Sequence, residues 1–317
     1  MDITLLQAIS GYKLNNEAVG LSPNTVIWYD SNLHLFHKWL APKLDHEPLL
    51  EEITSTHIRE YLAELRNDSP SFKDHPYRPT TDHPVSPRTV QAYYTSLSAF
   101  CNWAIREELI KVSPLKNIPR PKVPRHLPDP FTESEIRTLL KTCDQLTQRS
   151  KLRLKSMLLF LVDTGVRLGE LLDLKLSNLD LDQGRALIMG KGAKERYVFF
   201  GKTTRQALWR YISLARPEPY ARVENLFLYH DGRPITHRRF AAWLEDLEKR
   251  SGVTNVHPHR FRRTAAVQYI RNGGDIFSLQ KLLGHESLEM VRRYVELVAQ
   301  DVGNIHRNAS PVDGWRL

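Results

Sequence analysis

The chain has 317 residues, of which 41% are hydrophobic, and a formal net charge of +9. This hydrophobic content is enough for the cores of two domains and excludes a disordered chain. Residues 1–120 hold 12 Lys and Arg against 14 Asp and Glu, so the basic excess lies in the rest of the chain. A basic excess favours a polyanionic partner, although charge alone leaves open a basic surface without one.

The cysteine count and the apolar runs exclude several classes of protein. Cys101 and Cys143 lie far apart among apolar neighbours, which excludes a disulfide framework and zinc-ligand spacing. The first ten residues lack the basic and apolar segments of a signal peptide. The longest apolar run, residues 157–162, is too short to span a bilayer. We therefore expect a cytoplasmic protein with no membrane contact.

Residues 1–113 show helical periodicity. Ser22-Pro23, Ser55 and Ser86-Pro87 are typical helix starts, and apolar residues recur at helical spacing after each of them. Residues 67–87 contain five prolines and are expected to be irregular. The pattern predicts a bundle of about four helices.

Residues 114–130 are predicted to link two domains, because six prolines give this segment a semi-rigid, extended path. Basic residues stand between the prolines, at Lys116, Arg120, Lys122 and Arg125. They could follow a phosphate backbone, or the segment could be a solvated spacer. The sequence favours neither interpretation on its own.

The second domain is expected to start at residue 131. Thr132 and Glu135 have the spacing of a capping box. An apolar helix over about 152–162 should stop at Thr164-Gly165, and a short helix should start near Arg167. Further elements are predicted at 186–189 and 196–200, as strands of a hairpin around the turn 190–192, and at 203–215 and 237–251, as helices.

Three groups of residues could carry chemistry. His259 and Arg262 are three apart, so they share one face of a helix. Glu170 follows Arg167 by one turn and can hold its guanidinium through a bidentate pair. A tyrosine such as Tyr294 is a poor nucleophile at neutral pH, because the ordinary pKa of a phenol is about 10. It becomes effective when a base takes its proton and cations stabilise the developing charge.

Five motifs together resemble the tyrosine recombinase (phage integrase) family. In the family's order, they are T-G-x-R-x-x-E at 164–170, G-K-G at 190–192, H-x-x-R at 259–262, L-G-H at 283–285 and a tyrosine nine residues later. They span about half of the chain. The N-terminal bundle resembles the family's core-binding domain more loosely.

The resemblance implies a mainly α fold with two domains that form a C-shaped clamp around DNA. The first would be a helical, SAM-like core-binding bundle over 1–113, followed by the linker 114–130. The catalytic domain over 131–299 would be mixed α/β with a small antiparallel β-hairpin sheet. Residues 300–317 would dock on a neighbouring subunit, with a tail that folds back on its own domain as the alternative.

The resemblance also implies roles for single residues. Arg167 and Arg262 would clamp the non-bridging oxygens of the scissile phosphate, with Glu170 supporting them. Tyr294 would attack phosphorus and form a 3′-phosphotyrosine bond. Lys191 would protonate the leaving 5′ oxygen.

The two histidines of the motifs have implied roles as well. His259 would accept the tyrosine proton or hydrogen-bond the phosphate, and His285 would donate a hydrogen bond to a non-bridging oxygen. The covalent bond would conserve the phosphodiester energy, and guanidinium groups would replace metal ions. No ATP, metal or other cofactor is therefore implied.

The basic residues beside the motifs are less specific. Many relatives carry His directly after the second arginine, where this chain has Arg263. Arg263 and Arg293 are interpreted as contacts to the DNA backbone, with a plain basic surface as an equal alternative. Arg260 and Arg292 receive no role.

By resemblance, the partner would be double-stranded DNA with paired inverted half-sites. A homo-tetramer, or a hetero-tetramer with a paralogue, would act on two such sites through a Holliday junction. The biological role would be Xer-type resolution or the integration and excision of a mobile element. Two alternatives stay open: a DNA-binding regulator that does not cut, and an enzyme like type IB topoisomerases that nicks and reseals alone. The intact set of motif residues argues against the regulator.

Overall fold

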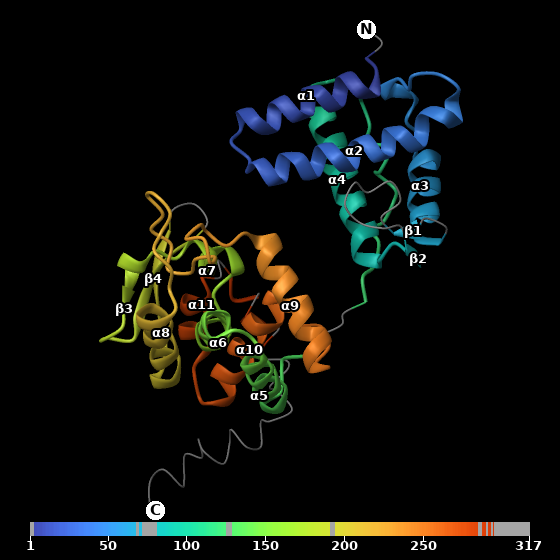
Figure 1. Ribbon diagram of the computed structural model, residues 1–317. Helices are drawn as coiled ribbons and strands as arrows, with labels where there is room; N and C mark the ends of the chain where they lie inside the picture. Colours follow the sequence, from blue (N-terminus) through green and yellow to red (C-terminus); the bar gives the residue numbers. More distant parts are fainter. Residues whose placement is uncertain are drawn as a thin grey trace, which may run out of the picture. The chain divides into compact units, whose positions relative to one another are not determined.

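The chain forms two compact units, residues 1–126 and 127–317, which are described separately (Figure 1). No helix in the described part of the chain is both long and apolar enough to cross a membrane. The computed structural model describes residues 3–67, 70–71, 81–124, 129–190, 194–284, 287–289, 291–292 and 294.

The first unit is the predicted helical bundle. Its elements are α1 (Leu5–Ala18), α2 (Pro23–Leu44), the 3₁₀ turn η1 (Leu50–Glu52), α3 (Ser55–Asn67) and α4 (Pro87–Arg106). Ser22 and Ser86 cap α2 and α4 as predicted, with the Thr25 and Thr89 amides as donors. Ser55 is not the cap of α3: the Thr54 hydroxyl accepts from the His57 amide, so the helix is capped one residue earlier.

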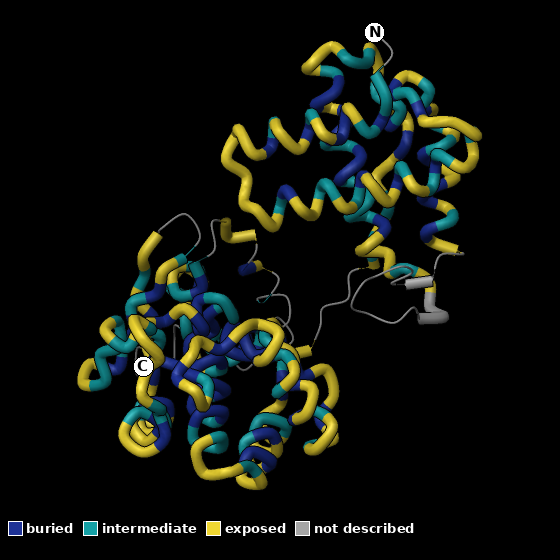
Figure 2. Tube along the Cα trace, turned by 45° about the horizontal axis from the view of Figure 1, so that its top comes forward, coloured by how far each residue is buried: buried dark blue, intermediate teal, exposed yellow. Residues whose placement is uncertain are grey.

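The buried faces of these helices meet in one apolar core (Figure 2). Phe36, Phe100 and Trp103 are among its large side chains. Leu115 and Ile118, from the predicted linker, are buried in the same core. The first half of the proline-rich segment therefore packs against the bundle.

Residues 67–87 are not wholly irregular. Strand β1 (Pro70–Ser71) pairs antiparallel with β2 (Thr81–Pro84), with a register shift between the two bonded positions. Each strand is an edge of this two-stranded sheet, where proline is tolerated because no second ladder needs its missing N–H. The proline count was therefore a poor guide to these two short strands.

The second unit is built around α6 (Gln148–Thr164), which packs against both α8 (Lys202–Leu214) and α10 (Pro258–Arg271) (Figure 1). Thr132 caps the preceding helix through the predicted box: Glu135 N donates to Thr132 Oγ1 over 3.2 Å, and Thr132 N to Glu135 Oε2 over 2.7 Å. The remaining helical elements are α5 (Glu133–Thr142), η2 (Cys143–Gln145), α7 (Leu168–Asp173), η3 (Leu176–Asn178), α9 (His237–Ser251) and α11 (Ile276–Leu283).

A small antiparallel sheet completes this unit. The predicted hairpin consists of β4 (Arg185–Met189) and β5 (Glu195–Phe199), and Met189 pairs with Glu195. Strand β3 (Leu179–Asp180) extends the sheet in the order β3-β4-β5. The sequence did not predict β3, because two residues are too few to show an alternating pattern.

Candidate active site

Three arginines bind the C-terminal end of α11. Gly284 ends this helix in the left-handed conformation, with φ of +64°. Three consecutive backbone carbonyls at this end, which a helix leaves without internal partners, each accept a hydrogen bond from a different guanidinium. The pairs are Arg196 Nε to Leu282 O (2.8 Å), Arg262 Nη2 to Leu283 O (2.8 Å) and Arg167 Nη2 to Gly284 O (3.3 Å). The negative end of the helix dipole also favours cations there.

Arg167 reaches this position because a glycine turn ends α6 just before it. Gly165 has φ of +63°, and Arg167 then forms the N-cap of α7. Glu170, in the first turn of α7, accepts from the Arg167 backbone N over 2.8 Å and from its Nη1 over 3.0 Å. Arg167 itself stays partly exposed, as a group that binds an external anion must.

Arg196 is the functional residue that the sequence analysis missed. It forms a bidentate pair with the buried Glu170, with Nη1–Oε1 of 3.0 Å and Nη2–Oε2 of 2.7 Å. Exposed and inward-facing residues alternate along β5, and Arg196 shares the inward-facing side with the buried Val198. That alternation was the available signal, because inward-facing charges are rare unless they are paired.

Gly165 also joins the site elements by close packing. A Cβ atom at this position would lie 2.8 Å from Leu283 Cδ2 and 3.1 Å from Ala265 Cβ. The Gly165 carbonyl accepts from Arg262 Nη1 over 2.7 Å. Only glycine fits this contact, which brings the end of α6 against α10 and α11.

The charges at this site are strongly coupled. Burial raises the pKa of Glu170, but the hydrogen bonds from Arg196 and from the Arg167 amide outweigh it, so that pKa lies below its ordinary value. Burial, followed by the nearby Arg167, lowers the pKa of Arg262 to about 10, so Arg262 remains protonated at neutral pH. The three guanidinium groups exceed the charge of Glu170 by two. A phosphate that gains negative charge in a transition state complements this excess.

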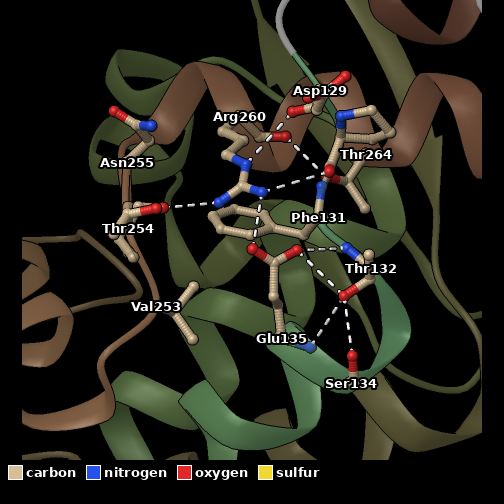
Figure 3. Close-up of polar contacts among 12 residues, drawn as sticks. Asp129, Phe131, Thr132, Ser134, Glu135, Val253, Thr254, Asn255, Arg260 and Thr264 are labelled. Carbon is tan, nitrogen blue, oxygen red and sulfur yellow. Dashed lines mark hydrogen bonds and ion pairs between the residues drawn. The ribbon is translucent and has the colours of Figure 1, made fainter.

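Helix α10 presents two arginines in different directions. Arg262 is buried toward the site. Arg260 instead lies against the start of the second unit, where Figure 3 shows it between Asp129, Thr254 and Glu135. Its Nη2 is 2.8 Å from Glu135 Oε1, and its Nη1 donates to Thr254 O over 2.7 Å. Arg260 is therefore buried and anchors the chain, and is not part of a basic surface.

Tyr294 is half-buried against a small apolar cluster that includes Ala266, Leu279 and Leu283. Burial lowers the pKa of Arg262 and that of Arg263, and the charge interaction with Tyr294 acts in the opposite direction on both. His259 lies exposed in the first turn of α10, three residues before Arg262.

The structure thus brings together Arg167, Glu170, Arg262 and Tyr294. Lys116, Arg120 and Lys122 are exposed in the first unit. Four predicted single residues and the tail lie outside the described residues: Arg125, Lys191, His285, Arg293 and residues 300–317.

Comparison with known proteins identifies the family. Residues 130–301 match the phage integrase family. The tyrosine recombinase XerC of Staphylococcus carnosus (strain TM300) is 32% identical over 292 residues, which cover 92% of each chain. The chain belongs to the phage integrase family of tyrosine recombinases. It is a site-specific recombinase, an enzyme that cuts and rejoins DNA.

Other relatives of this recombinase agree with the assignment. The XerC of Staphylococcus haemolyticus (strain JCSC1435) is 30% identical over 291 residues, or 92% of each chain. The XerH site-specific recombinase bound to palindromic difH substrate has a TM-score of 0.71 at 21% identity, covering 98% of this chain and 85% of that one. A lambda integrase dimer bound to a COC′ core site has a TM-score of 0.70 at 18% identity, covering 92% and 77%. These two structures confirm the mainly helical recombinase fold.

Proposed function

We propose that the recombinase cuts one DNA strand through attack of Tyr294 on phosphorus. The bond from the tyrosine oxygen to phosphorus forms as the bond to the 5′ oxygen breaks, which leaves a 3′-phosphotyrosine and a free 5′ hydroxyl. Attack by a 5′ hydroxyl reverses the step and rejoins DNA without ATP. The observation that supports this proposal is the group of three arginines on the end of α11, with Tyr294 packed against the same helix.

Arg167 and Arg262 bind the non-bridging oxygens in this proposal. Their guanidinium groups are already held by backbone carbonyls, so little reorganisation is needed when charge develops on phosphorus. Glu170 orients Arg167, and Arg196 in turn orients Glu170. Glu170 and Arg196 therefore act as positioning residues.

The remaining motif residues move protons or form hydrogen bonds with the phosphate. His259 accepts the tyrosine proton or forms a hydrogen bond with the phosphate. Lys191 protonates the leaving 5′ oxygen, and His285 donates a hydrogen bond to a non-bridging oxygen. The matching motif positions support these three roles. The DNA backbone is proposed to be contacted by five basic residues: Lys116, Arg120, Lys122, Arg125 and Arg293.

The substrate is proposed to be two DNA sites, each with paired inverted half-sites. The two domains of each subunit form a clamp around DNA, and four subunits exchange the strands of the two sites through a Holliday junction. The relatives bound to palindromic difH and to a COC′ core site support a site of this kind. The identity to XerC supports Xer-type resolution as the biological role. Integration or excision of a mobile element is the alternative, which repeats and cargo genes beside the gene would favour.

The experiment that tests the proposal is detection of a covalent protein–DNA adduct on a denaturing gel. The substrates are DNA fragments from either side of the gene, nicked near candidate inverted repeats, with EDTA present. Wild-type protein should give a retarded band, and Tyr294→Phe should bind the same DNA without forming it. An adduct that survives Tyr294→Phe would remove Tyr294 as the nucleophile. If the protein binds DNA but forms an adduct with none of the fragments, the result would favour a regulator that does not cut.

A further inference from the structure

Arg263 has a buried donor that the roles above do not use. It follows Arg262 on α10 and is half-buried. Its Nη1 atom is buried and has no hydrogen-bond partner among the described residues. Buried polar groups are almost always paired, and a buried cationic group is the most costly exception. An atom in this state needs an explanation.

The two neighbouring arginines of α10 do not share this property. Arg262 donates from both terminal nitrogens to the Gly165 and Leu283 carbonyls. Arg260 donates from all three nitrogens to backbone carbonyls and to Glu135. The described hydrogen bonds of these two guanidinium groups go to groups of the protein itself, whereas Nη1 of Arg263 has no acceptor in the described part of the protein.

The position of Arg263 on α10 relates it to the cluster that holds Tyr294. Arg263 lies one turn before Ala266, and residues three apart share a helix face. Ala266 belongs to the cluster against which Tyr294 packs. Burial lowers the pKa of Arg263, while its interaction with Tyr294 acts in the opposite direction. Arg263 therefore lies on the side of α10 that carries Ala266, and its half-buried charge interacts with Tyr294.

We propose that Arg263 is a further catalytic residue, whose Nη1 donates a hydrogen bond to the Tyr294 oxygen when that oxygen carries negative charge. This inference rests on the proposed function. During cleavage the phenol proton leaves to a base, the oxygen–phosphorus bond forms, the bond to the 5′ oxygen breaks, and Arg263 stays protonated throughout. In rejoining, the same donor stabilises the tyrosine oxygen as it leaves phosphorus. This role replaces the DNA-backbone contact that the sequence suggested for Arg263.

The first test needs no DNA. Benzenesulfonyl fluoride reacts with a phenolate, which forms an oxygen–sulfur bond and releases fluoride. Modification of Tyr294 in the full-length protein is followed by peptide mass spectrometry. Arg263→Met should slow it about 10-fold or more, because a preorganised donor of this kind contributes at least this much to a rate. Arg263→Lys should retain most of the rate, and the matched control Arg292→Met, at an exposed position two residues before Tyr294, should leave it unchanged.

The second test separates charge stabilisation from a structural role. Arg263→Met should lower the rate of adduct formation by about 10- to 100-fold with DNA affinity unchanged. Fluorotyrosine forms a phenolate more easily than tyrosine. When it replaces Tyr294 in the Arg263→Met variant, it should raise the rate of adduct formation several-fold. A structural defect would not respond to the acidity of the phenol. The melting temperature of Arg263→Met should not fall, because Nη1 has no described partner to lose.

The outcomes distinguish this inference from the proposed function. If wild-type protein forms the adduct and Arg263→Met forms it equally fast, the role of Arg263 is wrong and the proposed function stands. If wild-type protein forms no adduct, the proposed function is wrong, and the reaction with benzenesulfonyl fluoride still decides the interaction between Arg263 and Tyr294. Equal modification of Tyr294 in wild-type protein and Arg263→Met would overturn the inference.

Discussion

At the scale of single residues, Glu170 determines how two of the three arginines are held. It is buried, with only 7% of its side chain exposed, and binds both Arg167 and Arg196. A carboxylate that is buried without partners would lose its charge, whereas here it gains enough from both arginines to stay ionised. The negative charge of Glu170 in turn reduces the electrostatic repulsion between Arg167 and Arg196.

Glu170→Gln should lower the free energy of unfolding by about 2–4 kcal/mol at pH 7, because it leaves two partly buried arginines with a neutral partner. The pKa of Glu170 lies below its ordinary value of 4.5 in the folded protein. Its contribution is therefore present above the unfolded pKa and is lost as the pH falls through the folded pKa. The difference between wild-type protein and Glu170→Gln should shrink in acid, as measured by urea unfolding at pH 7 and pH 3.5.

The control for this prediction is Glu133→Gln, which removes an exposed carboxylate paired with Arg137 on α5. Exposed pairs of this kind contribute little, so the change should stay below about 0.5 kcal/mol. A difference for Glu170→Gln that is the same at both pH values would contradict the role of its charge.

Sequence motifs predicted Arg167, Glu170, Arg262 and Tyr294, and the structure brings these residues together. They could not predict Arg196, because its partner Glu170 is 26 residues away and only the folded sheet brings them within reach. Nor does the run of arginines in α10 show which of them face the site. Arg260 and Arg262 are both buried, and only their hydrogen-bond partners, which depend on the folded chain, separate the anchoring Arg260 from Arg262.

At the scale of secondary-structure elements, the turn at Gly165 fixes three helices at once. Gly165→Ala should lower the free energy of unfolding by about 2–4 kcal/mol, from the left-handed backbone and from contacts with Leu283 and Ala265 that are too close. It should also slow adduct formation, because the Gly165 carbonyl holds Arg262. Thermal unfolding and the adduct assay together measure both effects.

A matched control exists at the end of α9. Gly252 has a similar φ of +73°, but a Cβ atom there would meet nothing within 4 Å. Gly252→Ala should therefore show the backbone cost alone, about 1–2 kcal/mol, with normal adduct formation. If the two variants are equally stable and equally active, close packing at Gly165 has no part in the site.

Arg260 connects the beginning of the second unit to α10. Arg260→Met should lower the free energy of unfolding by about 2–4 kcal/mol, because Glu135 and three carbonyls lose their cationic donor. Arg250→Met, which removes an exposed pair with Asp246 on α9, is the control and should change little. Chemical denaturation measures both, and an equal effect of the two substitutions would rule out the anchoring role.

Local sequence signals predicted where helices end, but they did not predict the shortest strands. Gly165 and Gly252 end α6 and α9 in the left-handed conformation at the predicted positions. Strands β1 and β3 contain two residues each and owe their existence to pairing with a neighbouring segment. Such pairing leaves no periodic pattern in the chain itself.

For the assembled protein, residues 300–317 are predicted to contact a neighbouring subunit. Deletion of residues 300–317 should weaken assembly of the paired DNA complex while leaving binding to a single site nearly unchanged. Native gel electrophoresis and sedimentation with one-site and two-site DNA measure the two quantities. Unchanged assembly would favour a tail that folds back on its own domain.

The proline-rich segment is anchored at both ends, which determines where the protein can be divided. Gln91 donates to the Pro121 carbonyl over 2.8 Å, and Arg260 donates to the Asp129 carbonyl over 3.2 Å. A fragment that carries only the helical bundle must therefore extend to Pro121. A fragment that carries the arginines and Tyr294 must begin at or before Asp129. A protease site placed between these two residues would release both fragments with their anchoring hydrogen bonds intact.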